Sequence, residues 1–241
     1  YQFPYQYWSW MAQMMPFYEQ DNLWKQADAW ARTPTNPEQY RWWPWGNFWS
    51  SPQTPANPAL GFVVKTLICP ADSRESIAMA GGQAGIYPGS SVAFTGYLAA
   101  EGVQNNDRKG ILYWKSRASF GDVTDGTSNT LMVGERPPSR DLQYGWWFAG
   151  AGYDSFGVGD VFMEARAFQY AAHLGCPATS VGFQPGQVNN TCDQAHWWSL
   201  HTGGGNFLRG DGSVKFYTYA MDTILPQLVT KSGGEVVADD F

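Results

Sequence analysis

Charge is scarce in this sequence. Only 15% of its 241 residues are Asp, Glu, Lys or Arg, and 21 acidic residues against 15 basic ones leave a net charge of −6. This balance provides no positive field that would attract phosphate or an anionic membrane surface. No window has the roughly 18 consecutive apolar residues that a membrane-spanning helix needs. We therefore expect no nucleic-acid partner and no membrane span within these residues.

Cysteine is scarce as well, and three residues cannot form a disulfide scaffold. Cys176 and Cys192 enclose a loop of glycines and polar residues, which predicts one disulfide if the compartment is oxidising. Two alternatives stay open. The pair can remain unlinked, or His173 and His196 can join it, because His-x-x-Cys and Cys-x-x-x-His spacing can hold a tetrahedral zinc ion. In each case Cys69 is left over.

Catalytic motifs are also missing. The sequence has no G-x-S-x-G nucleophile elbow, no glycine-rich phosphate loop and no HExxH pair. His201 and Asp211 could belong to a nucleophilic triad, but without a nucleophile motif a structural hydrogen bond is the simpler role for the histidine. We therefore predict no catalytic residues and expect that the protein is not an enzyme.

Apolar residues, by contrast, are plentiful: 44% of the chain is hydrophobic and 17% aromatic, which is enough for a substantial core. They recur at helical spacing over residues 7–15 and again over residues 16–30, with Pro16 separating the two predicted helices. The apolar positions of the first are Trp8, Met11, Ala12 and Met15, and those of the second include Phe17, Leu23, Trp24, Ala27 and Trp30. We predict that this stripe is core, because helical spacing is what core packing produces.

Short apolar runs predict strands at residues 63–69, 91–98, 110–114, 130–135 and 144–148. Residues 149–196 contain glycines and few apolar residues in register, so we expect an irregular insertion there. A last helix over residues 222–231 is predicted to be capped by Asp222, and Pro226 can divide it into two pieces.

The C-terminal part contains a predicted hairpin. Asp211-Gly212 lies between two short apolar runs, which predicts a tight turn with Gly212 at positive φ. A two-residue loop would place Arg209 opposite Val214, and a three-residue loop would place Leu208 there. Either register divides the apolar side chains between the two faces, so we expect the hairpin to be covered on both sides.

Four segments together resemble the large bacterial family of type II secretion pseudopilin-like proteins that is abundant in planctomycetes. They are P-F-Y-E-Q at residues 16–20, C-P-A-D at residues 69–72, D-G-T-S-N-T at residues 125–130 with the glutamate that follows, and a histidine separated by nine residues from Asp-Gly. The structural motif positions of this resemblance are Cys69, Asp125, Gly126, Asn129, Glu135, His201, Asn206, Asp211 and Gly212.

The resemblance implies an α+β head spanning residues 1–241, with an N-terminal helical segment packed on an antiparallel sheet and loop-rich insertions. It implies a structural subunit of a type II secretion or type IV pilus-like filament in the cell envelope, whose partners are its own copies or other pseudopilins. Members of the family begin with a basic leader and a long apolar helix that anchors the precursor in the inner membrane, so the resemblance implies that such a segment, absent from these residues, precedes Tyr1 in the precursor. The resemblance also suggests that a partner of Cys69 lies in that missing part.

A metal and a glycan are the two ligands left open. Asp122 and Asp125 could coordinate calcium, which some major pseudopilins bind in their C-terminal region, whereas turn capping by Asp and Ser side chains explains the same residues without a metal. No other cofactor is expected.

Residues 33–58 form a predicted long loop, because prolines and asparagines interrupt it on both sides of its tryptophans. Those tryptophans are Trp42, Trp43, Trp45 and Trp49. Exposed rings could stack on sugars or contact a neighbouring subunit, whereas a loop folded over the core would have the same composition. The alternative function is a secreted or surface glycan-binding module that uses this loop together with Trp146-Trp147 or Trp197-Trp198.

Overall fold

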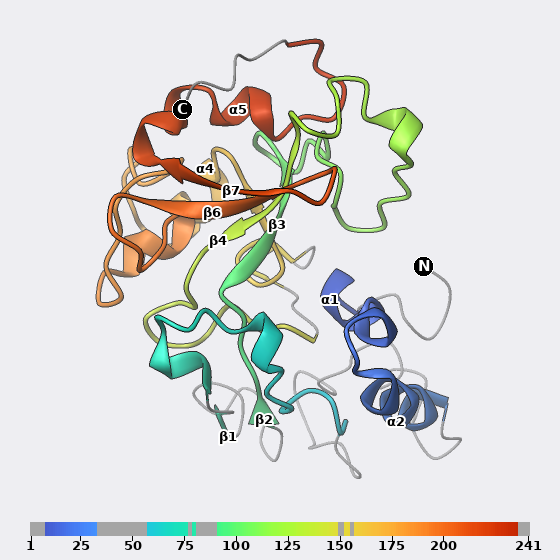
Figure 1. The fold of residues 1–241 in the computed structure, drawn as a ribbon. Helices are drawn as coiled ribbons and strands as arrows, with labels where there is room; N and C mark the ends of the chain where they lie inside the picture. Colours follow the sequence, from blue (N-terminus) through green and yellow to red (C-terminus); the bar gives the residue numbers. More distant parts are fainter. Residues whose placement is uncertain are drawn as a thin grey trace.

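The structure is a computed structural model, and it describes residues 8–32, 57–76, 79–80, 91–148, 152–154 and 157–235. Its centre is a five-stranded sheet with the order β5-β3-β4-β6-β7. Figure 1 labels β3, β4, β6 and β7 of this sheet. The strands are β3 (Tyr97–Gly102), β4 (Leu131–Glu135), β5 (Phe162–Glu164), β6 (Gly204–Arg209) and β7 (Val214–Thr218). A separate two-stranded sheet pairs β1 (Met79–Ala80) with β2 (Ser91–Val92). The predicted α+β class is confirmed.

The large sheet is mixed, although an antiparallel sheet was expected. β3, β4, β6 and β7 pair antiparallel, but β5 lies parallel to β3 at its edge. β3 is buried on both faces, since Ala99 contacts the N-terminal apolar cluster while Leu98 and Ala100 contact the cluster on the other side. A strand covered on both faces needs consecutive apolar residues rather than alternating ones, and β3 has them.

The N-terminal helices are α1 (Trp10–Gln13), a 3-10 turn at Met15–Phe17 and α2 (Asp21–Arg32). The Ser9 side chain caps α1 by accepting the Ala12 N–H, and Pro16 lies in the first turn of the 3-10 segment. All four predicted apolar positions of residues 7–15 are buried. Phe17, predicted to be core, is 83% exposed because it ends the 3-10 turn instead of lying on α2. No helix in the described part of the chain is both long and apolar enough to cross a membrane.

The hairpin forms with Leu208 opposite Val214, as the three-residue loop requires, and Gly212 has φ +87°. The expected burial of both faces is wrong. Phe207 and Tyr217 are buried against the core, whereas Val214 is 65% exposed and Phe216 is 43% exposed. One face of the hairpin is therefore open, because no helix or loop of the described chain covers those side chains.

Three predicted strands have other structures. Residues 63–69 contain a 3-10 turn at Lys65–Leu67, which buries Val64 and Leu67 without a ladder. Residues 110–114 form bends that lead into a turn. Gly110 lies so close to β3 that a Cβ on it would be 2.1 Å from the Ala100 carbonyl oxygen. Residues 144–148 contribute only the isolated bridge between Phe94 and Trp146. The other two predicted strands exist, with changed or similar bounds. Residues 91–98 divide into β2 and the start of β3, and β4 matches the predicted strand at residues 130–135 closely.

The predicted insertion, residues 149–196, is not irregular throughout, because it supplies β5 and α4 (Phe168–His173). At the C-terminal end, the predicted helix is two short pieces, a 3-10 turn at Tyr219–Thr223 and α5 (Leu225–Leu228). Asp222 does not cap a helix as predicted. Its carboxylate instead accepts the Phe183 N–H at 2.7 Å and pairs with Arg166 at 2.8 Å, which fixes the insertion to the C-terminal segment.

Candidate functional site

Three of the four motif segments meet at one point, where Cys69, Glu135 and His201 place one sulfur, one oxygen and one nitrogen within 4.8 Å of one another. The His201 Nε2 atom lies 3.3 Å from Glu135 Oε1 and 3.9 Å from Cys69 Sγ. Cys69 and Glu135 are buried, and the His201 side chain is 36% exposed. We call these three residues the Cys-Glu-His cluster.

Cys69 is held by the turn that begins with it. The Asp72 N–H donates to the Cys69 carbonyl at 2.9 Å, and the buried Asp72 carboxylate pairs with Arg74 at 2.5 Å. Arg74 also donates to the carbonyl of Pro138 at 3.2 Å. The C-P-A-D segment is thus fixed to the chain that follows β4, which places Cys69 next to the end of that strand.

Glu135 ends β4, and its side chain bonds to the neighbouring strand. Its Oε2 accepts the Asn206 backbone N–H at 2.7 Å, and its Oε1 lies 3.3 Å from the Asn206 amide nitrogen. A Cβ on Gly205 would lie 3.3 Å from Oε2, so a glycine there lets β6 come close to the carboxylate. These contacts hold the carboxylate in one orientation.

His201 lies in the loop before β6. Its backbone N–H donates to Ser199 Oγ at 3.0 Å, and Ser199 in turn donates to the Gly204 carbonyl at 2.7 Å. Gly203 has φ +84°, which glycine adopts without strain, and so the chain can turn sharply from His201 into β6. The turn directs the imidazole toward Glu135 and Cys69.

His201 and Asp211 do not face each other, so the catalytic pairing considered from the sequence does not form. They lie at opposite ends of β6, and the Asp211 carboxylate accepts the Ser213 N–H at 2.9 Å and its hydroxyl at 2.7 Å. These bonds hold the pKa of the Asp211 carboxyl below its ordinary value. Asp211 and Gly212 therefore form the hairpin turn that the Asp-Gly pair predicted.

The other acidic pair also forms turns. Asp122 accepts the Ser119 N–H and hydroxyl, each at 2.7 Å, and these bonds lower the pKa of its carboxyl. Asp125 accepts the N–H groups of Gly233 and Gly234 at 2.6 and 2.9 Å, and its carbonyl accepts the Asn129 amide at 3.0 Å. Gly126, at φ +95°, completes this turn. The two carboxylates thus accept protein N–H and O–H donors, as the turn interpretation expects.

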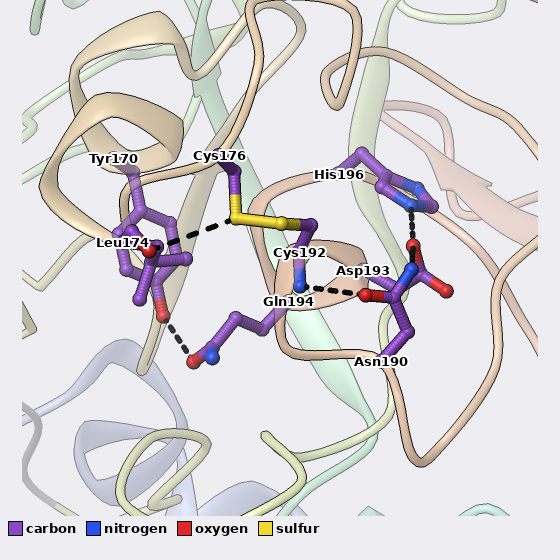
Figure 2. Close-up of a disulfide and its surroundings, with 8 residues drawn as sticks. All are labelled: Tyr170, Leu174, Cys176, Asn190, Cys192, Asp193, Gln194 and His196. Carbon is purple, nitrogen blue, oxygen red and sulfur yellow. Dashed lines mark hydrogen bonds and ion pairs between the residues drawn. A yellow bond between two sulfur atoms is a disulfide. The ribbon is translucent and has the colours of Figure 1, made fainter.

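Cys176 and Cys192 form the predicted disulfide, with Cα atoms 5.6 Å apart (Figure 2). The zinc alternative for this loop is wrong, because sulfurs joined to each other cannot act as thiolate ligands. Its two histidines have other contacts: His173 lies against the Tyr153 ring, and the His196 Nε2 lies 3.1 Å from an Asp193 oxygen.

The tryptophans proposed for glycan binding divide into two groups. Trp146, Trp147, Trp197 and Trp198 are at most 5% exposed, so a sugar ring cannot stack on them and this part of the glycan prediction is wrong. They are core residues, as the Trp197 contact with Phe207 illustrates. Residues 42–49 lie outside the described residues.

A family model described as "Protein of unknown function (DUF1559)" matches residues 2–223, so the chain belongs to this family. The group is one of bacterial proteins. A search of curated proteins and a search of solved structures each found no match.

Sequence reasoning named every member of the Cys-Glu-His cluster as a motif position but did not bring the three together. Cys69 and His201 are 132 residues apart, and no spacing rule joins them. It also missed a group of buried carboxyls, of which Glu101 and Glu164 are the most enclosed. In the sequence, each of these two glutamates follows a short apolar run, and this pattern could have identified them as buried acidic residues at the end of a strand.

Proposed function

We propose that this chain is the globular head of a pseudopilin-like subunit of a type II secretion or type IV pilus-like assembly in the cell envelope. The observation that carries the proposal is the meeting of the motif segments. Cys69, Glu135 and His201, on which the resemblance to pseudopilin-like proteins rests, share one cluster with Asn206. Motif residues that contact one another in the fold support a common origin. This support is stronger than that of motif matches at separate places along the sequence.

The N-terminal helical segment gives further support. It is bonded to the head, since the Ser9 N–H donates to the Phe148 carbonyl at 2.9 Å and the Trp10 indole donates to the Val161 carbonyl at 3.0 Å. Between α1 and α2, Met14 is 46% exposed and Phe17 is 83% exposed. Apolar side chains left in solvent at this place suit contact with a neighbouring subunit in a filament.

The proposal is tested in cells that make the whole protein, by chemical cross-linking followed by detection of multimers. We expect a ladder of cross-linked copies in the parent and its loss in Phe17→Asp, because a carboxylate cannot enter an apolar subunit contact. Phe120→Asp is the matched control, since Phe120 is 81% exposed but lies in a different segment, the 3-10 turn Phe120–Asp122. A parent that stays monomeric in the envelope would refute the filament proposal.

A further inference from the structure

The Cys-Glu-His cluster combines three different donor atoms, and we propose that it binds a divalent metal ion of the zinc type. A thiolate sulfur, an imidazole nitrogen and a carboxylate oxygen are the three protein ligands that zinc takes. Hard cations such as calcium and magnesium take oxygen ligands alone, so this donor set does not suit them. The site differs from the one considered at Cys176 and Cys192, whose sulfurs are bonded to each other.

The separations between donor atoms fit a shared ion. With zinc bond lengths and tetrahedral angles, nitrogen and oxygen ligands lie about 3.4 Å apart, and nitrogen and sulfur ligands about 3.6 Å apart. The corresponding distances from His201 Nε2 are 3.3 Å to Glu135 Oε1 and 3.9 Å to Cys69 Sγ. The third pair, Cys69 Sγ and a Glu135 carboxylate oxygen, lies within 4.8 Å. The three side chains therefore already converge, and an ion can enter by drawing them closer together.

One nitrogen faces both partners, and this distinguishes a metal site from a nucleophilic triad. In a triad, one ring nitrogen takes the proton of the nucleophile while the acid holds the other nitrogen. Here the contacts to Cys69 and Glu135 both involve Nε2 of His201. Such an arrangement does not relay a proton from the thiol through the ring to the acid, but it does bring three possible ligand atoms within 4.8 Å of one another.

The surroundings provide what a metal site needs beyond its ligands. The Asn206 backbone and amide hold the Glu135 carboxylate, as outer contacts of metal ligands commonly do. Cys69 and Glu135 are buried, whereas His201 is partly exposed and marks the side from which an ion can enter. Three protein ligands leave one tetrahedral position for water or for a donor from another molecule.

Cobalt(II) titration tests the proposal directly, because cobalt bound by a thiolate absorbs in the near ultraviolet. The sequence has three cysteines, and two of them form the disulfide, so a thiolate–cobalt band can only come from Cys69. The chain is used with Cys69 verified by mass as a reduced thiol and the disulfide intact. We expect one cobalt ion per chain with this band, and displacement of the cobalt by zinc.

Variants then assign the ligands. We expect Cys69→Ser to lose the band, His201→Asn and Glu135→Gln to weaken zinc binding by about 100-fold, and Asn206→Ala to weaken it by about 10-fold. His173→Asn, at an exposed histidine outside the cluster, is the control and should bind as the parent does. Near-ultraviolet circular dichroism confirms that each variant is folded.

Two results would overturn the proposal. One is a folded parent that shows no thiolate–cobalt band at micromolar cobalt. The other is a thiolate–cobalt band and a zinc affinity that stay unchanged in the His201→Asn variant. The His201 side chain is partly exposed, so its replacement leaves no cavity in the core. Loss of multimers in the cross-linking experiment would leave both results unaffected, so the metal site and the filament proposal are tested separately.

Discussion

The buried carboxyl of Glu101 predicts an unusual dependence of stability on pH. Glu101 lies on β3 and is fully buried, and neither carboxyl oxygen has a hydrogen-bond partner in the described part of the chain. Burial, reinforced by the nearby carboxylates of Asp154 and Glu164, raises the pKa of Glu101 from 4.5 to about 8. The pKa of Glu164 is raised to about 7, mainly by burial.

A raised carboxyl pKa means that the folded state binds the proton more tightly than the unfolded state does. Between pH 4.5 and about 8 unfolding therefore releases protons, so the free energy of unfolding falls as the pH rises through this window. The difference between a pKa of 4.5 in the unfolded state and about 8 in the folded state corresponds to at most about 5 kcal/mol of the free energy of unfolding. Because the Glu164 carboxylate contributes to this shift and its own pKa is also raised, we assign about half, or about 2 to 3 kcal/mol, to Glu101.

Glu101→Gln removes this titration while keeping the shape of the protonated side chain. We expect the variant to match the parent within about 1 kcal/mol at pH 5 and to exceed it by about 2 to 3 kcal/mol at pH 9. Urea denaturation at pH 5, 7 and 9 measures the free energies of unfolding. Glu19→Gln, at an exposed residue, is the control and should leave the pH profile unchanged.

The opposite result at high pH would refute this reasoning. If Glu101 were ionised and held by a cation, Glu101→Gln would destabilise the protein at pH 9 rather than stabilise it. A parent whose stability is the same at pH 5 and pH 9 would equally show that the carboxyl does not retain its proton in the fold.

Three further predictions concern stability. Gly212→Val should lower the free energy of unfolding by about 1 to 3 kcal/mol, because a β-branched residue is strained at φ +87°, and an unchanged thermal melt would refute the turn assignment. Replacing Cys176 and Cys192 together with alanine should cost about 3 kcal/mol, because the bond closes a loop of 16 residues, and denaturation of oxidised parent and variant measures it. Asp125→Ala should cost about 1 to 2 kcal/mol through the two glycine N–H groups that its carboxylate accepts, equally with and without a calcium chelator; a penalty that appears only with calcium would favour the metal interpretation.

The sequence by itself determined the local elements. Helical spacing identified the buried face of residues 7–15, and α1 has Met11 and Ala12 in the core. The Asp-Gly pair placed the hairpin turn, since a positive φ at Gly212 is a property of a few neighbouring residues. The glycine and polar content between Cys176 and Cys192 similarly indicated the loop that their disulfide closes.

Only the tertiary structure decided which apolar runs became strands and which motif residues met. Residues 63–69 and 144–148 are buried like strands but find no partner for a continuous ladder, and pairing depends on segments distant in sequence. The Cys-Glu-His cluster exists because β4 lies beside β6 and the Asp72–Arg74 ion pair holds the Cys69 turn against the end of β4. The meeting of these three residues depends on packing between segments far apart in the chain. The apolar periodicity of a single sequence does not indicate which distant segments pack together.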